Sequence, residues 1–245
     1  MADNRASADA LPGSRDATGS SDDTALIDAI DQLLPQTQCT QCGFDGCRPY
    51  AQSIVREQTP INRCPPGGAA GIAVLAQHTG RAVIPLDPSC GIERPRHIAR
   101  IIDSLCIGCT LCIAACPVDA IAGTAKRLHA VINEDCTGCE LCIAPCPVDC
   151  IEMVEPPAVL AGWGRAEADA ARRRLMQRTA RLARVEQTTH ERLAGRAQAH
   201  LEEIEHELDQ AASSADTAPL DALARKRAVI EAAIARARAR LEGAA

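Results

Sequence analysis

One cysteine-rich motif occurs twice in this chain and constrains its fold more than any other feature. The first copy reads CIGCTLCIAACPVDAI from residue 106, and the second reads CTGCELCIAPCPVDCI from residue 136. Twelve of the sixteen letters agree, and each cysteine of the first copy recurs thirty positions later. The segments IARIID and HAVIN lead into the copies with strand-like alternation. We therefore expect two copies of one unit: a strand, a cysteine loop, a short helix and a strand.

The cysteine spacing predicts two iron–sulfur clusters with crossed ligands. The run C-x2-C-x2-C-x3-C-P is the bacterial pattern in which the fourth cysteine of each run binds the other cluster. One copy therefore cannot complete its own cluster. Zinc sites usually pair two CxxC knuckles at a distance, and thiols in such loops are poorly placed for disulfides, so both alternatives are less favoured. The predicted ligands are Cys106, Cys109, Cys112 and Cys146 for cluster 2, and Cys116, Cys136, Cys139 and Cys142 for cluster 3.

Another group of four cysteines precedes the repeat. Cys39, Cys42, Cys47 and Cys64 have the spacing C-x2-C-x4-C-x16-C-P. They complete one tetrahedral set of thiolates without borrowing, so their spacing leaves both zinc and an iron–sulfur cluster open. We expect the two remaining cysteines, Cys90 and Cys150, to be small buried apolar residues. A redox or spare-ligand role for them has no supporting pair in the sequence.

Composition narrows the class of protein. The only aromatic residues are Phe44, Tyr50 and Trp163, although rings usually fill much of a core. Bound clusters would supply that missing bulk, because metal binding contributes folding free energy. We find no secretory signal and no apolar run long enough to span a bilayer, so we expect a reducing cytosol in which thiolates hold metals. The net charge is −6, concentrated in residues 1–164; solubility explains it more simply than steering of a basic partner.

The remaining pattern predicts an α+β protein followed by long helices. We expect a helix from Asp23 or Thr24 to about Leu34 with Leu26, Ile30 and Leu33 on one face, and another over 69–78. Apolar residues at three- and four-residue spacing follow residue 165 and predict a helical hairpin or coiled coil, interrupted at 213–219. The expected parts are a disordered tail (1–22), the first cysteine domain (23–80), a linker (81–97), a ferredoxin domain (98–155) and a helical extension (165–242).

Residues 24–155 resemble the RnfB/RsxB family, whose members are subunits of Rnf-type electron transport complexes. The resemblance rests on CTQCGFDGCRPYAQSI and INRCPPGG followed by the two-cluster motif. It implies a small Rnf-type 4Fe-4S domain with a third [4Fe–4S] cluster, cluster 1, on Cys39, Cys42, Cys47 and Cys64. It also implies electron relay in a membrane-associated, ion-translocating system. That family carries an N-terminal membrane helix where this chain has a polar tail, and residues 165–242 lie outside the family pattern.

We expect an electron carrier and not an enzyme: a soluble ferredoxin of RnfB type that relays single electrons between redox partner proteins through three [4Fe–4S] clusters. We place it in the cytoplasm or peripherally on the inner face of the cell membrane. One alternative is a fixed subunit of an Rnf-like membrane complex, with the helices as a docking arm. Another is a structural or redox-sensing iron–sulfur protein whose helical tail binds a partner. The helices also offer a surface for self-association; we expect no nucleic-acid partner.

Overall fold

The computed structural model describes residues 21–213 and 220–242. They fall into two compact units that meet inside one long helix, between Leu175 and Met176, and all fourteen cysteines belong to the first unit. The predicted tail lies outside the described residues except for Ser21 and Asp22, which already belong to the first helix. Among the described residues, no helix combines the length and apolar character needed to cross a bilayer.

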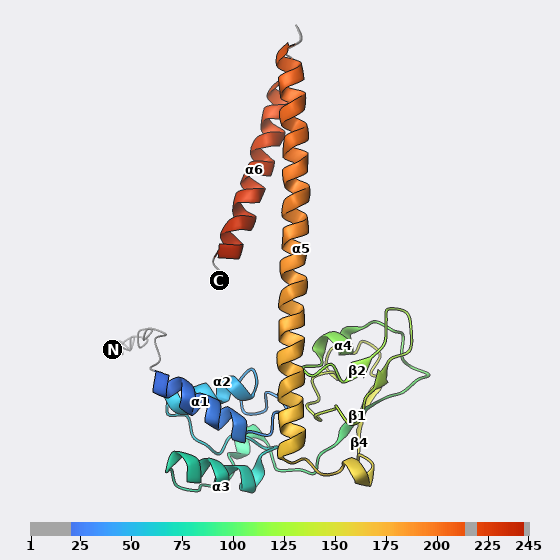
Figure 1. Cartoon of the computed structure of the whole chain (residues 1–245). Coiled ribbons are helices and arrows are strands. Elements are labelled where there is room, and N and C mark those ends of the chain that lie inside the picture. Colours follow the sequence, from blue (N-terminus) through green and yellow to red (C-terminus); the bar gives the residue numbers. More distant parts are fainter. Residues whose placement is uncertain (1–20, 214–219, 243–245) are drawn as a thin grey trace, which may run out of the picture. The chain divides into compact units, whose positions relative to one another are not determined.

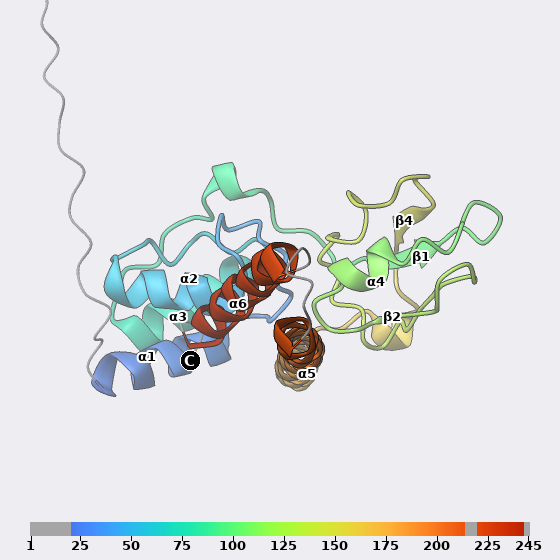
Figure 2. The same ribbon diagram turned by 90° about the horizontal axis from the view of Figure 1, so that it is seen from above.

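Three helices form the N-terminal part of the first unit: α1 (Ser21–Leu33), α2 (Cys47–Arg56) and α3 (Gly68–Thr79). They lie together in both views (Figures 1 and 2). Ile27 and Ile30 form the buried face of α1, continued by Leu34 just after its end, whereas Leu26 of the predicted face is exposed. Both sets have helical spacing, and the side that packs against α2 and α3 is chosen by tertiary contact. The helix expected over 69–78 is α3, which continues one residue further to Thr79 and is closed by Gly80 in the left-handed conformation.

The repeat folds into two small antiparallel sheets that interlock its copies. The strands are β1 (Ile98–Ile101), β2 (Ile121–Ala122), β3 (Ala130–Val131) and β4 (Ile151–Val154). The strand before the first copy, β1, pairs with β4 after the second copy, and β2 pairs with β3. Each copy therefore contributes one strand to each sheet. Buried residues of both copies, with Ile98, Val118 and Ile151 among them, share one core.

The two copies differ in their short helices. The first copy has α4 (Leu111–Ala115), but the second has only turns at 141–145, so the expected second helix is absent. The second copy carries Pro145 where the first has Ala115. Proline has no N–H to donate within a helix, and its ring clashes with the preceding turn. The remaining short elements are the 3-10 turns η1 (Pro88–Cys90) and η2 (Ala158–Leu160).

The C-terminal residues form α5 (Arg165–Ser213) and α6 (Leu220–Glu242). In the second unit, Leu201 and Ile204 of α5 are buried, and so are Leu223 and Ile234 of α6. Arg227 of α6 lies 3.9 Å from the Glu205 carboxylate of α5. Earlier residues of the predicted apolar stripe, namely Leu182, Val185 and Leu193, are exposed. Because α6 has 23 residues against 49 in α5, it is too short to cover the whole stripe.

Candidate metal centres

The first cysteine group gathers at the start of α2. Cys47 is the first residue of that helix, and Cys39 and Cys42 lie in the loop before it. Burial, with the nearby Cys39, Asp31 and Cys42, raises the pKa of the Cys47 thiol to about 12. Burial also raises the pKa of Cys64, and its neighbours Cys47, Cys39 and Cys42 add to the effect. The four predicted cluster 1 cysteines are therefore close enough to influence one another.

A chain of buried amides holds this loop in place, and sequence reasoning missed it. The side-chain Oε1 of Gln38 accepts the backbone N–H of Cys47 at 2.9 Å, while the Nε2 of the same side chain donates to the Gln36 Oε1 at 2.9 Å. Gln36 in turn donates to the Asp31 carboxylate at 3.1 Å. Gln36 and Gln38 both have φ of 57°, a conformation that glutamine rarely adopts. No local sequence signal marks these glutamines, because they read as ordinary loop residues.

The structure brings Cys116 of the first copy to three cysteines of the second. Cys116, Cys136, Cys139 and Cys142 line one small cavity whose walls include Val118, Ile121 and Met153. Burial raises the pKa of Cys142 to about 12, and Cys139, Cys136 and Cys116 contribute to that shift. Two backbone N–H groups point at these sulfurs: Ala120 donates to Cys116 at 3.2 Å and Ala99 to Cys136 at 3.4 Å.

The other predicted set lies around the first copy's loop. Burial raises the pKa of Cys112, and the neighbouring Cys109 and Cys106 contribute. Cys150 is buried as expected, but it also lies 3.5 Å from Cys146, sulfur to sulfur. Burial and then Cys146 and Cys106 raise the pKa of Cys150 to about 12, so Cys146, the predicted crossed ligand, lies near Cys106 of the first copy.

Two further side chains belong to these surroundings. His129 is fully buried, with its Nδ1 atom 3.3 Å from the Cys112 sulfur. Cys90 is buried as expected, and it adds to the raised pKa of Cys42 after burial and Cys39. Neither contact had a signal in the sequence, because His129 and Cys90 are distant along the chain from the cysteines that they approach.

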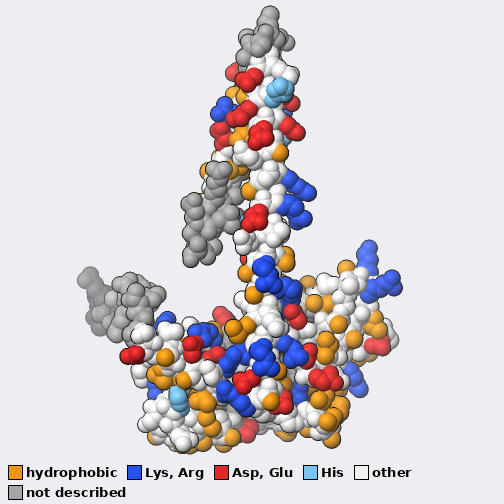
Figure 3. Space-filling model, in the orientation of Figure 1, with side chains coloured by type: hydrophobic (Ala, Val, Ile, Leu, Met, Phe, Trp, Pro, Cys, Tyr) orange, Lys and Arg blue, Asp and Glu red, His pale blue; other side chains and the backbone are white. Residues whose placement is uncertain are grey.

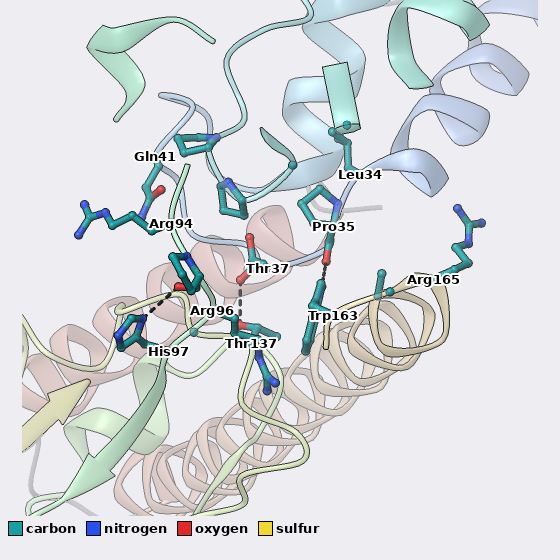
Figure 4. A pocket seen from close by; sticks show the side chains of 18 of the residues that line it. Leu34, Pro35, Thr37, Gln41, Arg94, Arg96, His97, Thr137, Trp163 and Arg165 are labelled. Atoms are coloured by element: carbon teal, nitrogen blue, oxygen red, sulfur yellow. Dashed lines mark hydrogen bonds between the residues drawn. The ribbon is translucent and has the colours of Figure 1, made fainter. Parts of the chain in front are cut away.

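The loops of the first and third centres adjoin. Figure 4 shows Thr137, next to Cys136, pointing toward the segment before Cys39. Its hydroxyl donates to the Thr37 carbonyl at 3.0 Å. The Trp163 indole N–H donates to the Pro35 carbonyl at 2.8 Å (Figure 4). Beside these contacts lies a cavity of about 790 Å³, with Arg94 and Arg96 in its wall.

The donor chemistry fits iron–sulfur clusters. Each of the three sets offers four cysteines, as a [4Fe–4S] cluster requires, and N–H groups beside the sulfurs are the second-shell contacts that raise reduction potentials. Within residues 21–213 and 220–242, no three His, Cys, Asp or Glu side chains converge on a point that would hold a single ion. A four-iron cluster is a larger body, in which each thiolate binds a different iron.

Two stretches match known families. Residues 99–153 match the family described as a 4Fe-4S dicluster domain, and residues 34–66 match a family described as a putative Fe-S cluster. These stretches contain the repeat and the first cysteine group, respectively. Iron–sulfur domains are thus indicated in both parts of the first unit. No solved structure matches the chain.

Curated relatives share more than half of the aligned residues, and each is named as the B subunit of an ion-translocating oxidoreductase complex. The protein from Azoarcus sp. is 55 % identical over 106 residues, which cover 43 % of this chain and 58 % of the relative. The protein of the same name from Hahella chejuensis is 56 % identical over 138 residues, covering 56 % and 70 %. That from Alkalilimnicola ehrlichii is 55 % identical over 140 residues, covering 56 % and 75 %. The chain spans only 58 % and 56 % of the Azoarcus and Thiobacillus denitrificans proteins.

Proposed function

The chain belongs to the RnfB/RsxB family of ion-translocating oxidoreductase complexes, and from this premise we propose that it relays single electrons through three [4Fe–4S] clusters. When bound, each cluster takes up and releases one electron. The proposed ligands are the three cysteine sets defined above for clusters 1, 2 and 3. No side chain of the chain makes or breaks a substrate bond in this proposal, so the protein acts as a carrier within a larger oxidoreductase.

The observation that carries the proposal is the position of Cys116. Cys116 belongs to the first copy, but it lies around one cavity with Cys136, Cys139 and Cys142 of the second copy. Its equivalent in the second copy is Cys146, thirty positions later. The bacterial two-cluster pattern requires this exchange of the fourth ligand. A pair of zinc knuckles has no need for it.

The polypeptide has three tasks in this function. Thiolates hold the iron, and because burial raises the pKa of Cys47 and Cys142 to about 12, iron has to displace protons from these thiols as it binds. The N–H groups of Ala99 and Ala120 stabilise negative charge on the sulfurs and so raise the reduction potential. Apolar walls such as Val118 and Met153 exclude water from the third centre.

The comparisons favour a component of a complex over a free carrier. The relatives cited above are all named as parts of a complex, so the expectation of a soluble, stand-alone ferredoxin finds no support in them. We propose that this chain likewise exchanges electrons with other subunits of an Rnf-type complex, peripherally at the membrane. Co-purification of the full chain with flavin-containing or membrane subunits tests this point. Isolation of the chain as a monodisperse brown protein that carries electrons without any other subunit would contradict it.

The decisive experiment is the ligand map of the full chain prepared without oxygen. We expect about twelve irons and twelve acid-labile sulfides per chain, that is, three clusters with four of each. Reduction should give electron paramagnetic resonance signals of reduced [4Fe–4S] clusters. Alkylation followed by peptide mass spectrometry then locates freed thiols. Cys116→Ser should release Cys136, Cys139 and Cys142, and the matched variant Cys146→Ser should release Cys106, Cys109 and Cys112. Zinc in place of four irons would contradict the proposed cluster 1. If Cys116→Ser instead released Cys106, Cys109 and Cys112, the crossed ligand assignment would be refuted.

A further inference from the structure

The two related cysteine loops present their equivalent faces to different surroundings. In the second copy this face is covered by the chain itself. Thr137 is 3 % exposed and donates to the Thr37 carbonyl, and Asp135 forms an ion pair with Arg174 of α5. The N-terminal part thus docks beside cluster 3 through the outward side of its loop.

The same face of the first copy is open and apolar. Leu105 and Ile107 occupy the positions that correspond to Asp135 and Thr137, and they are 47 % and 59 % exposed. Leu111 of the same loop is 46 % exposed. Large apolar side chains gathered on a protein surface mark interaction sites. Two of the predicted ligands in this loop, Cys106 and Cys109, are only partly buried, so the centre lies close to this surface.

A basic turn borders this apolar face and is hydrogen-bonded to its loop. The Lys126 N–H donates to the Gly108 carbonyl at 2.9 Å. Gly108 has φ of +69°, and a Cβ atom there would lie 2.6 Å from the backbone of Arg127, so the glycine permits this close approach. Lys126 and Arg127 are both exposed, and within the ranges that the structure describes neither takes part in an ion pair. Figure 3 shows Lys and Arg side chains at the outer edge of the part that carries β2, next to hydrophobic ones.

We propose that Leu105, Ile107, Leu111, Lys126 and Arg127 form a docking face for a redox partner protein whose contact surface has an apolar centre and an acidic rim. The inference rests on the proposed electron-carrier function and deepens it. The internal contact at Thr137 supports this proposal. In the second copy this side of the loop already packs against another part of the protein, and we propose that the same side of the first copy packs against a partner. The partner is expected to be acidic because Lys126 and Arg127, which form no ion pair with any described residue, border the face, although residues 98–155 are otherwise mainly acidic. Complementary charge speeds the encounter of two proteins. The three centres then form a series: cluster 1, cluster 3, cluster 2, partner.

The test measures electron transfer between the cluster-loaded full chain and an acidic two-cluster bacterial ferredoxin as the probe. The probe is reduced beforehand; in the reaction it loses one electron per event and the chain gains it, with no proton transferred. Stopped-flow absorbance at several salt concentrations gives the second-order rate constant. We expect the double variant Lys126→Glu/Arg127→Glu to lower this constant at least about tenfold at low salt, with the difference disappearing at high salt.

Two further variants sharpen the result. Arg225→Glu/Lys226→Glu makes the same change of net charge on exposed residues of α6 and should leave the rate constant within about twofold. Ile107→Thr introduces the residue that the second copy carries at the matching position, so the loop geometry tolerates it. It should weaken the transfer about tenfold at every salt concentration, because it removes apolar contact.

The outcomes separate this proposal from the one on which it rests. Iron content and full reduction by dithionite are measured for every variant. If these are normal but all variants transfer electrons equally fast, or if both charge variants slow the reaction equally, the docking face is wrong and the carrier function stands. The docking face is also wrong if Lys126→Glu/Arg127→Glu changes only the sedimentation coefficient, since the face then contacts another copy. If no preparation contains reducible clusters, both proposals fail together.

Discussion

Tyr50 controls the geometry of the first centre, and we expect Tyr50→Phe to loosen that centre selectively. The ring is 1 % exposed and stacks on Phe44, with ring centroids 5.5 Å apart. Its hydroxyl donates to the Pro60 carbonyl at 2.8 Å and accepts the backbone N–H of Arg63 at 3.1 Å. These bonds fix the turn that leads into Cys64. The substitution removes one oxygen atom and keeps the packed ring.

The magnitude follows from those two bonds. Each contributes about 1 kcal/mol net, so losing both costs about 2 kcal/mol, which raises the population of the opened turn about 30-fold. The assay is the anaerobic loss of iron to excess chelator, with each centre identified by the cysteines that become open to alkylation. We expect Cys64 and its three partners to be released about 30-fold faster in Tyr50→Phe. The cysteines of the repeat should keep their rates and provide a control within the same molecule.

Two results would refute this reasoning. An acceleration below about threefold would mean that the hydroxyl contributes well under about 1 kcal/mol and that other contacts hold the turn. An equal acceleration at all three centres would mean that Tyr50 stabilises the whole first unit and not the segment before Cys64.

Three other expectations can be tested with the same protein. Gly138→Ala should remove cluster 3, because Gly138 has φ of +72° and an added Cβ would lie 2.4 Å from the His97 carbonyl oxygen. In the control variant Gly71→Ala the added Cβ meets no atom within 4 Å, so all iron should be kept. In iron-free folded protein the pKa of Cys47 is raised from 9.0 to about 12, so its alkylation should have a midpoint near pH 12, against about 9 in concentrated urea; equal midpoints would contradict this. The contribution of that thiol to stability is then complete below about pH 9 and lost as the pH rises to about 12. Trp163→Phe removes the N–H bonded to Pro35 and should lower the free energy of unfolding by about 1 kcal/mol, as measured by denaturant titration; an unchanged value would show that this bond contributes nothing net.

A local pattern that carries a chemical requirement predicts which residues lie together, and the cluster ligands themselves stay predictions. The spacing of eight cysteines predicts that Cys116 belongs with the second copy, and the fold brings it next to Cys136 and Cys142. The paired strands that join the copies follow from the same duplication. The missing helix of the second copy could also have been predicted, since Pro145 is visible in the sequence and excludes it.

The rest depends on contacts between distant residues. Thr137 and Thr37 lie one hundred positions apart, and neither sequence neighbourhood suggests that a hydroxyl of one will meet a carbonyl of the other. Gln36 and Gln38 look like loop residues until their burial and positive φ are seen. On α1 the predicted Ile30 is buried, but Ile27 and Leu34 are buried with it in place of Leu26, and packing against α2 and α3 decides between these helical faces.

The exchange of strands between the copies also orders events at the ribosome. The strands β2 and β3 are close in sequence and can pair as soon as they have left the exit tunnel, but β1 finds its partner only when β4 has been made. A nascent chain that ends just after β3 has a complete first loop and can form the β2–β3 pair, but it lacks β4 and Cys146. Iron delivered at that moment would find neither cysteine set of the repeat complete, because each set draws ligands from both copies. Cluster insertion therefore has to wait until the second copy has been translated.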